Sequence, residues 1–115
     1  MIWERLLEYC LAKPGAWQDE PWEGDVVAKV GDKVFAFLGS PAGDAIGLKC
    51  GPDRDTADEW LARYPGAVTA SSYIGRYGWN SLALSGGIPE DELLAAVDES
   101  YDAILAKLPK RLRPA

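Results

Sequence analysis

The feature that most constrains the fold is a stretch in the C-terminal third, where a strand pattern runs through a turn into a long amphipathic helix. Alternation of apolar with small or polar residues predicts a strand over residues 79–85. After Gly86-Gly87, Pro89 suits the first helical turn, because its missing N–H costs nothing there, and three acids follow where the helix dipole favours negative charge. The apolar stripe of this helix consists of Leu93, Leu94, Val97, Tyr101, Ile104, Leu105 and Leu108. We therefore expect it to be the main element of the core.

The N-terminal part indicates a helix followed by a hairpin. Apolar residues at helical spacing predict a helix over residues 2–12. Two β-rich runs, Val26–Val30 and Lys33–Leu38, are separated by Gly31-Asp32, which is typical of a tight hairpin turn. The segment between helix and hairpin, residues 16–25, shows neither period, so we expect an ordered loop with at most a short edge strand.

The middle of the chain predicts a third strand over residues 45–50 and a second helix after Gly51-Pro52. Asp53 is the expected N-cap, since its side chain can accept a hydrogen bond from a free N–H of the first turn. Pro65-Gly66 should end this helix, and a fourth strand is expected over residues 67–72.

The predicted element order is α-β-β-β-α-β-β-α. Half-apolar strands combined with amphipathic helices favour an α+β fold, a two-layer α/β sandwich whose antiparallel sheet carries the helices on one face. With 115 residues and neither an internal repeat nor a linker, the chain is expected to be a single domain over residues 1–115.

Charge is unevenly distributed along the chain. The net charge of −6 disfavours long-range attraction to nucleic acid or to anionic membranes. The C-terminal tail, however, contains four cations and no acid, so it forms a basic patch on an acidic body. No apolar run is long enough to span a bilayer, and the N-terminus lacks the pattern of a signal peptide. We therefore expect a cytoplasmic protein without a membrane partner.

Enzymatic function is disfavoured by what the sequence lacks. It contains no histidine, which excludes the Ser-His and Cys-His forms of nucleophile activation and the commonest transition-metal ligand. No phosphate-binding glycine motif occurs, and the acids of Asp53–Glu59 lack the pattern of a calcium loop. Cys10 and Cys50 show no C-x-x-C spacing and are expected to be buried free thiols. We expect no catalysis, no metal and no cofactor.

Strand parity identifies a candidate binding group. It places Lys49 and Trp79 with Ser81 on the face of the sheet away from the helices, and Arg76 and Tyr77 flank them. An aromatic ring beside cations on an open sheet is suited to single-stranded nucleic acid, through base stacking and phosphate pairing. In the alternative interpretation Trp79 only covers neighbouring strands and Lys49 is a solvated residue. A bulge would disperse the group.

The basic tail also has two interpretations. Lys107, Lys110, Arg111 and Arg113 could contact phosphates. Cations near a helix C-terminus also offset the helix dipole without any ligand. Since four cations exceed what a cap requires, both interpretations stay open.

Several segments carry a family resemblance that runs nearly from end to end. They are LAKPGA (11–16), Pro21-Trp22, VVAKVGDKVFAFL (26–38), LKCGPDRD (48–55), ARYPGAV (62–68), WNSLAL (79–84), GGIPEDEL (86–93) and ESYDAILAKLPKRLR (99–113). In this order they resemble the MmcQ/YjbR family of small bacterial proteins. The last segment is the most specific of them.

The resemblance implies a two-layer α/β sandwich with the element order given above. Family members are described as DNA-binding by likeness to a double wing transcription-factor domain, so DNA binding is implied by analogy, and fold alone does not fix function. This chain departs from the family in one place. Members often carry a basic residue and a histidine before the Trp-Asn pair, where Tyr77-Gly78 stands here. A role that depends on that histidine is absent.

Three hypotheses about function follow. The first is a non-enzymatic domain that binds DNA or another nucleic acid. Its contact residues would be Lys49, Arg76, Tyr77, Trp79, Lys107, Lys110, Arg111 and Arg113. The second is a protein-interaction or chaperone-like module, in which the acidic body and the aromatic segment 16–25 bind a basic protein or peptide. The third is a small-molecule site between the sheet and the connection over residues 73–78.

Overall fold

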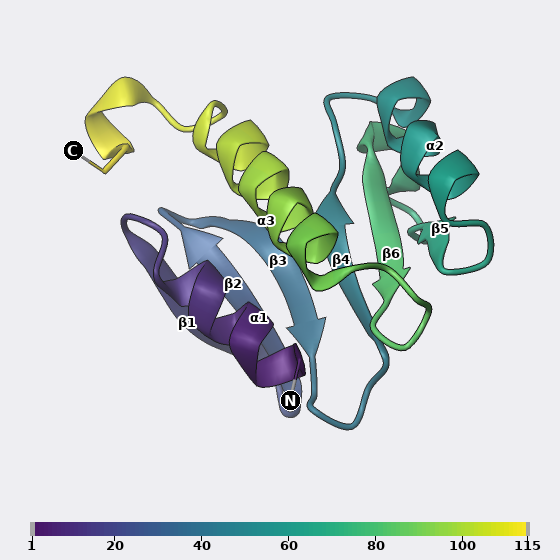
Figure 1. Ribbon diagram of the computed structural model, residues 1–115. Coiled ribbons are helices and arrows are strands. Elements are labelled where there is room, and N and C mark those ends of the chain that lie inside the picture. Colours follow the sequence, from purple (N-terminus) through teal and green to yellow (C-terminus); the bar gives the residue numbers. More distant parts are fainter. Residues whose placement is uncertain (1, 115) are drawn as a thin grey trace.

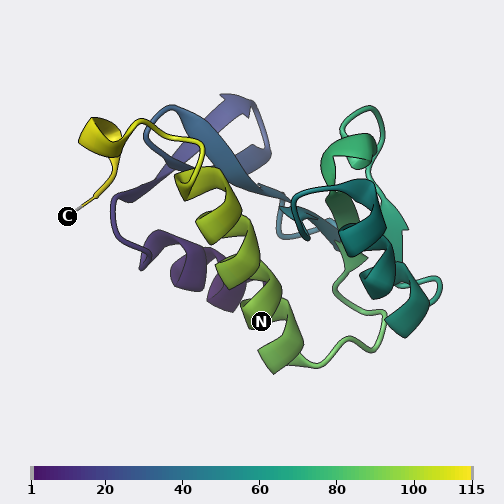
Figure 2. The same cartoon turned by 90° about the horizontal axis from the view of Figure 1, so that it is seen from above.

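A computed structural model describes residues 2–114 of the chain. Within this range six strands form one antiparallel sheet in the order β1-β2-β3-β4-β6-β5. The elements are α1 (Ile2–Leu11), β1 (Ala16–Trp22), β2 (Asp25–Val30), β3 (Lys33–Gly39), β4 (Ala45–Lys49), α2 (Arg54–Arg63), β5 (Val68–Ala70), the 3-10 turn η1 (Gly75–Tyr77), β6 (Trp79–Ala83), α3 (Glu90–Leu105) and η2 (Lys110–Leu112). Helices α1 and α3 lie across one face of the sheet, and α2 covers its β5–β6 end (Figures 1 and 2). The predicted α+β fold is confirmed.

Three local predictions are confirmed at their boundaries. The β2–β3 hairpin turns at Gly31-Asp32. Helix α2 begins after Asp53, whose side chain accepts a hydrogen bond from the backbone N–H of Thr56 at 2.9 Å. Helix α3 begins at Glu90, directly after Pro89. Each of these features is decided by residues close together in the sequence, which is why the sequence pattern predicts them.

The segment expected to be an ordered loop with at most a short edge strand forms the seven-residue edge strand β1. It pairs antiparallel with β2 from Ala16 to Asp19 and again at Trp22, with a register shift between the two parts. Pro21 lies within this shift, where its missing N–H interrupts no regular ladder. An edge strand that is exposed over most of its length needs no apolar alternation. The element order is therefore α-β-β-β-β-α-β-β-α, with one strand more than predicted.

Both cysteines, Cys10 and Cys50, are buried free thiols, as expected. Burial raises the pKa of each thiol to about 12. Both therefore stay protonated and unreactive at neutral pH. As for membranes, the helices found between residues 2 and 114 are all too short or too polar to cross one.

The core lies between the helices and the sheet. Phe35 stacks on Tyr101 of α3 with ring centroids 5.2 Å apart, and the Trp3 indole N–H of α1 donates to the Leu38 carbonyl at 2.8 Å. Two register shifts between β2 and β3 make Phe35 and Leu38 the extra residues of bulges. As a result these two side chains are buried in the core, whereas Phe37 stays partly exposed on the opposite face.

Strands β3 and β4 are joined by an unusually short ladder. Only Ala36 with Leu48 and Phe37 with Gly47 are in register within the described residues. Beyond them the buried Ser100 hydroxyl of α3 takes the place of a direct ladder bond. It accepts a hydrogen bond from the Lys49 N–H at 2.9 Å and donates one to the Phe35 carbonyl at 2.5 Å. The third helix is thus hydrogen-bonded to both strands at the point where they separate.

We expect Ser100→Ala to lower the free energy of unfolding by about 1–3 kcal/mol, because it leaves a buried N–H and a buried carbonyl without partners. Urea denaturation checks this. Ser72→Ala is the matched control, since Ser72 is exposed on a loop. Equal stability of the two variants would show that water or a shifted backbone replaces the hydroxyl.

Candidate nucleic-acid interface

Lys49 and Trp79 share one face of the sheet, but their end of that face is covered. They are cross-strand partners in β4 and β6. Lys49 is only 2% exposed and Trp79 only 8%. The Trp79 indole packs edge to face on Phe37 with centroids 5.3 Å apart, and the Lys49 ammonium donates a hydrogen bond to the Tyr77 carbonyl. The open surface expected here is therefore closed, because the connection before β6 folds over the end of β4.

The surroundings of Lys49 lower the pKa of its ammonium. Burial is the largest cause, and the charge of nearby Lys107 adds to it, while Asp53 opposes both. Lys107 at the end of α3 lies close enough to Lys49 for their charges to interact, and Lys49 in turn contacts Tyr77. The two cationic parts of the sequence, around Arg76 and in the tail, therefore lie at the same end of the sheet.

The 3-10 turn η1 presents a cation beside exposed aromatic rings. The Arg76 guanidinium lies 4.8 Å from the centroid of the Tyr77 ring, and Tyr77 is 51% exposed. Tyr73, which the sequence analysis did not select, is 96% exposed in the same loop and has a φ of 65°. An aromatic residue in a polar loop next to Ser71-Ser72 is the sequence signal that could have identified it.

The position of this loop depends on Arg54 of α2. The guanidinium donates to the carbonyls of Gly75 at 2.8 Å and of Trp79 at 3.1 Å. It also donates to the Asn80 side-chain oxygen at 2.5 Å, and the Asn80 amide donates to the Ala57 carbonyl at 3.0 Å. A buried network thus fixes η1 and the start of β6 against α2.

In the tail, Arg113 differs from the other three cations. Its guanidinium folds back to donate to the carbonyls of Leu108 at 2.9 Å and Ala106 at 3.0 Å, which caps the C-terminus of α3. Lys107, Lys110 and Arg111 are exposed. The two interpretations of the tail therefore apply to different residues, since Arg113 is used as a cap and the other three are accessible.

Apart from the buried Lys49 and the capping Arg113, the cations divide into two groups. Within residues 2–114, one group forms ion pairs with carboxylates: Arg5–Glu90, Lys13–Asp98, Lys29–Asp19, Arg54–Asp58 and Arg63–Glu92. A second group is exposed and has no carboxylate within ion-pair distance in that range. We call it the basic end, and it consists of Lys33, Arg76, Lys107, Lys110 and Arg111.

Contacts and topology place the members of the basic end along one end of the sheet, with the tail beside the β2–β3 turn and Arg76 next to β6 on the far side of β4. Lys33 directly follows the Gly31-Asp32 turn, and Leu108 packs so closely on Gly31 that a Cβ there would lie 3.1 Å from its methyl groups. In Figure 1 the tail and the β2–β3 turn lie on the left, and the start of β6 lies at the upper right. Two acids, Asp32 and Asp53, lie at this end as well and weaken its positive potential.

The comparisons with known proteins agree with this fold. A family model described as YjbR matches residues 11–103. The uncharacterized protein YjbR of Escherichia coli K12 is 31% identical over 116 residues, which cover 98% of this chain and 95% of that protein. A crystal structure of a Deinococcus radiodurans protein with a DUF419 domain has a TM-score of 0.82 at 20% identity, over 95% of this chain and 83% of the other. A Pseudomonas syringae structure has a TM-score of 0.63 at 17% identity, over 84% and 93%.

Proposed function

The chain belongs to the YjbR family, whose model matches residues 11–103, and we propose that it is a non-enzymatic domain that binds nucleic acid through the basic end. The proposal rests on the site, because a fold alone does not define a function. The observation that carries the proposal is the difference between the ion-paired cations and the exposed, unpaired cations of the basic end. Those elsewhere on the surface are neutralised by carboxylates, whereas five exposed cations at one end are not. Unpaired lysine and arginine side chains are the groups that replace the counterions of a phosphate backbone.

The exposed rings of Tyr73 and Tyr77 favour single strands over duplexes. They lie in the loop that carries Arg76, and unstacked bases can stack on aromatic rings beside a cation. In this proposal Lys49 and Trp79 do not contact the ligand. They are buried beneath the loop, and the Lys49 ammonium holds it in place through its hydrogen bond to the Tyr77 carbonyl. The net charge of −6 restricts binding to this one end and keeps the affinity modest.

A fluorescence anisotropy titration with a labelled single-stranded oligonucleotide and its duplex tests the proposal. If about four phosphates are contacted, the association constant for the single strand should fall by nearly three powers of ten between about 20 mM and about 200 mM salt. The duplex should bind more weakly. Absence of binding at the lower salt concentration would contradict the proposal, since phosphate contacts are strongest there.

Two double variants with the same net charge locate the binding surface. Lys110→Gln/Arg111→Gln removes two cations of the basic end and should reduce the salt slope by about 1.4, since each phosphate contact contributes about 0.7 for single strands. Arg5→Gln/Arg63→Gln removes two exposed, ion-paired arginines elsewhere and should leave the slope unchanged. If both pairs weaken binding equally, only the overall charge matters and the basic end is not the interface.

A protein-interaction module is the second candidate, and the β1–β2 hairpin favours it. Trp17 is 44% and Trp22 70% exposed on a segment that also carries Asp19, Glu20 and Glu23. Exposed aromatic residues among acids suit a basic partner. A pull-down that recovers the same protein partner before and after nuclease treatment would favour this candidate over nucleic-acid binding.

A further inference from the structure

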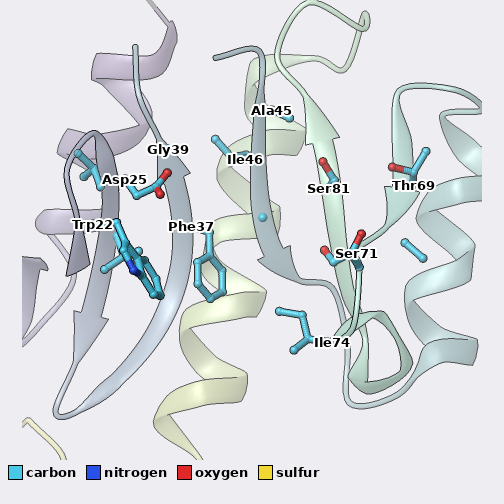
Figure 3. A pocket seen from close by; sticks show the side chains of 15 residues that line it. Trp22, Asp25, Phe37, Gly39, Ala45, Ile46, Thr69, Ser71, Ile74 and Ser81 are labelled. Carbon is cyan, nitrogen blue, oxygen red and sulfur yellow. The ribbon is translucent and has the colours of Figure 1, made fainter. Parts of the chain in front are cut away.

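A hollow of about 570 Å³ lies on the face of the sheet away from α3. Figure 3 shows it between Trp22 and Phe37 on one side and Ile74, Ser71 and Thr69 on the other, with α3 behind the sheet. Its volume falls in the range of small-molecule sites, roughly 300–1,000 Å³. The β1–β2 connection at one rim lies at the opposite end of β2 from the β2–β3 turn, whereas the wall formed by Ser71 and Ile74 belongs to the loop that carries Arg76.

Glycine at position 47 creates this hollow. One row of cross-strand partners runs Val27, Phe37, Gly47, Ser81 and Thr69. At its centre Gly47 contributes no side chain, and a Cβ there would lie 3.3 Å from the Phe37 Cβ. The row therefore has apolar side chains on one side, hydroxyls on the other and a depression between them.

The charge of the lining is the second observation. Among the described residues that line the hollow, Asp25 has the only charged side chain, and there is no lysine or arginine. No ion pair within residues 2–114 engages its carboxylate. Trp22, the cross-strand partner of Asp25, is 70% exposed. In Figure 3 the Asp25 carboxylate and the Trp22 indole lie together at one rim of the hollow.

A carboxylate next to an accessible indole is suited to an organic ammonium ion. The carboxylate attracts the positive charge, and an indole face attracts it through its quadrupole. The apolar floor of Val27, Phe37 and Ile74 suits a hydrophobic body on the same ligand. An anionic ligand would be repelled both by Asp25 and by the net charge of −6.

We propose that this hollow binds a small primary amine that carries an apolar body, with the ammonium group at Asp25 and Trp22 and the apolar part over Phe37 and Gly47. Such a site uses other residues than the proposed nucleic-acid surface, although Ser72 and Ile74 of its wall flank Tyr73 in the same loop. The third hypothesis placed a small-molecule site between the sheet and residues 73–78. The hollow agrees with it in part, because Ile74 is the residue of that connection that lines the hollow.

The test uses three probes of nearly equal size: 2-phenylethylamine, 2-phenylethanol and phenylacetate. Two-dimensional NMR titration should give the tightest binding for the amine, about tenfold tighter than for the alcohol, since a partly exposed ion pair and a cation–π contact contribute together. Phenylacetate should bind least. The shifted signals should be those of Phe37, Gly47 and Ile74. Equal binding of the three probes, or no binding of the amine at millimolar concentration, would overturn the proposal.

Three variants separate the parts of the site. Asp25→Asn should abolish the preference for the amine over the alcohol and leave binding of the alcohol intact. Glu23→Gln is the matched control, because it makes the same charge change on the same hairpin outside the hollow. Trp22→Ala should weaken binding of the amine without changing the packing of the core, since Trp22 is an exposed rim residue. Equal effects of Glu23→Gln and Asp25→Asn would mean that the preference reflects overall charge, which contradicts a defined site.

Discussion

Gly78→Ala is expected to lower the free energy of unfolding by about 3–4 kcal/mol. Gly78 has a φ of 94°, a conformation that costs an L-residue roughly 1–2 kcal/mol. In addition, the Cβ of an alanine would lie 2.4 Å from the Gly51 carbonyl oxygen and 3.0 Å from that of Asp53. These are backbone atoms, so no side-chain rotation can relieve the overlap, and the added cost is that of an overpacked site, about 1–3 kcal/mol.

Gly66→Ala separates the two contributions. Gly66 has a similar φ of 82°, but nothing lies within 4 Å of the position its Cβ would take. This variant should therefore show the conformational cost alone in urea denaturation, and Gly78→Ala should exceed it by about 2 kcal/mol. If the two variants are equally stable, the β4–α2 connection and the end of η1 do not pass as closely as described.

The second large effect is expected for Asn80→Ala, which should cost about 3 kcal/mol. Asn80 is fully buried, and its amide joins the guanidinium of Arg54 to the Ala57 carbonyl. Removing it leaves one N–H of the Arg54 guanidinium and the Ala57 carbonyl of α2 without a partner, which is costlier than losing a neutral surface hydrogen bond. Thermal or urea denaturation measures the loss.

A double-mutant cycle with Arg54→Met tests whether the two residues act as a unit. Because both contribute to one network, the double variant should be more stable than the sum of the single losses predicts, by about 1–2 kcal/mol. Arg54 also holds the carbonyl of Gly75, so Arg54→Met should loosen the loop that carries Arg76 and weaken nucleic-acid binding. Additive losses in the cycle would show that Arg54 and Asn80 stabilise the fold independently.

The parts of the fold that could be predicted from the sequence are those with local causes. A two-residue turn at Gly31-Asp32, a carboxylate cap at Asp53 and a proline before Glu90 each act on the next few residues. Strand β1 could not be found in this way. It exists because β2 offers it a partner, and its own residues, Pro21 among them, give no strand pattern.

In the candidate site, too, the features with local causes could be predicted and those that depend on distant contacts could not. Strand parity was sufficient to put Lys49 and Trp79 on one face, because no bulge interrupts the pairing of β4 with β6. Their burial depends on the position of η1, which is set by Arg54 from α2 and by the conformation of Gly78. The choice of Arg113 as the cap of α3 likewise depends on how the tail folds back. Contacts between distant segments cannot be inferred from spacing along the chain.

The short ladder between β3 and β4 has a consequence for the order in which the molecule assembles. All six strands precede α3 in the chain, yet the hydroxyl that bridges the two halves of the sheet belongs to Ser100, which is 65 residues from Phe35 and 51 from Lys49. We therefore expect that, before α3 packs, the two halves of the sheet are joined only by the short ladder between β3 and β4. Helix α3, which follows these strands in the chain, connects the two half-sheets through the Ser100 hydroxyl. Closing such long loops is slow, so completion of the sheet is expected to limit the folding rate.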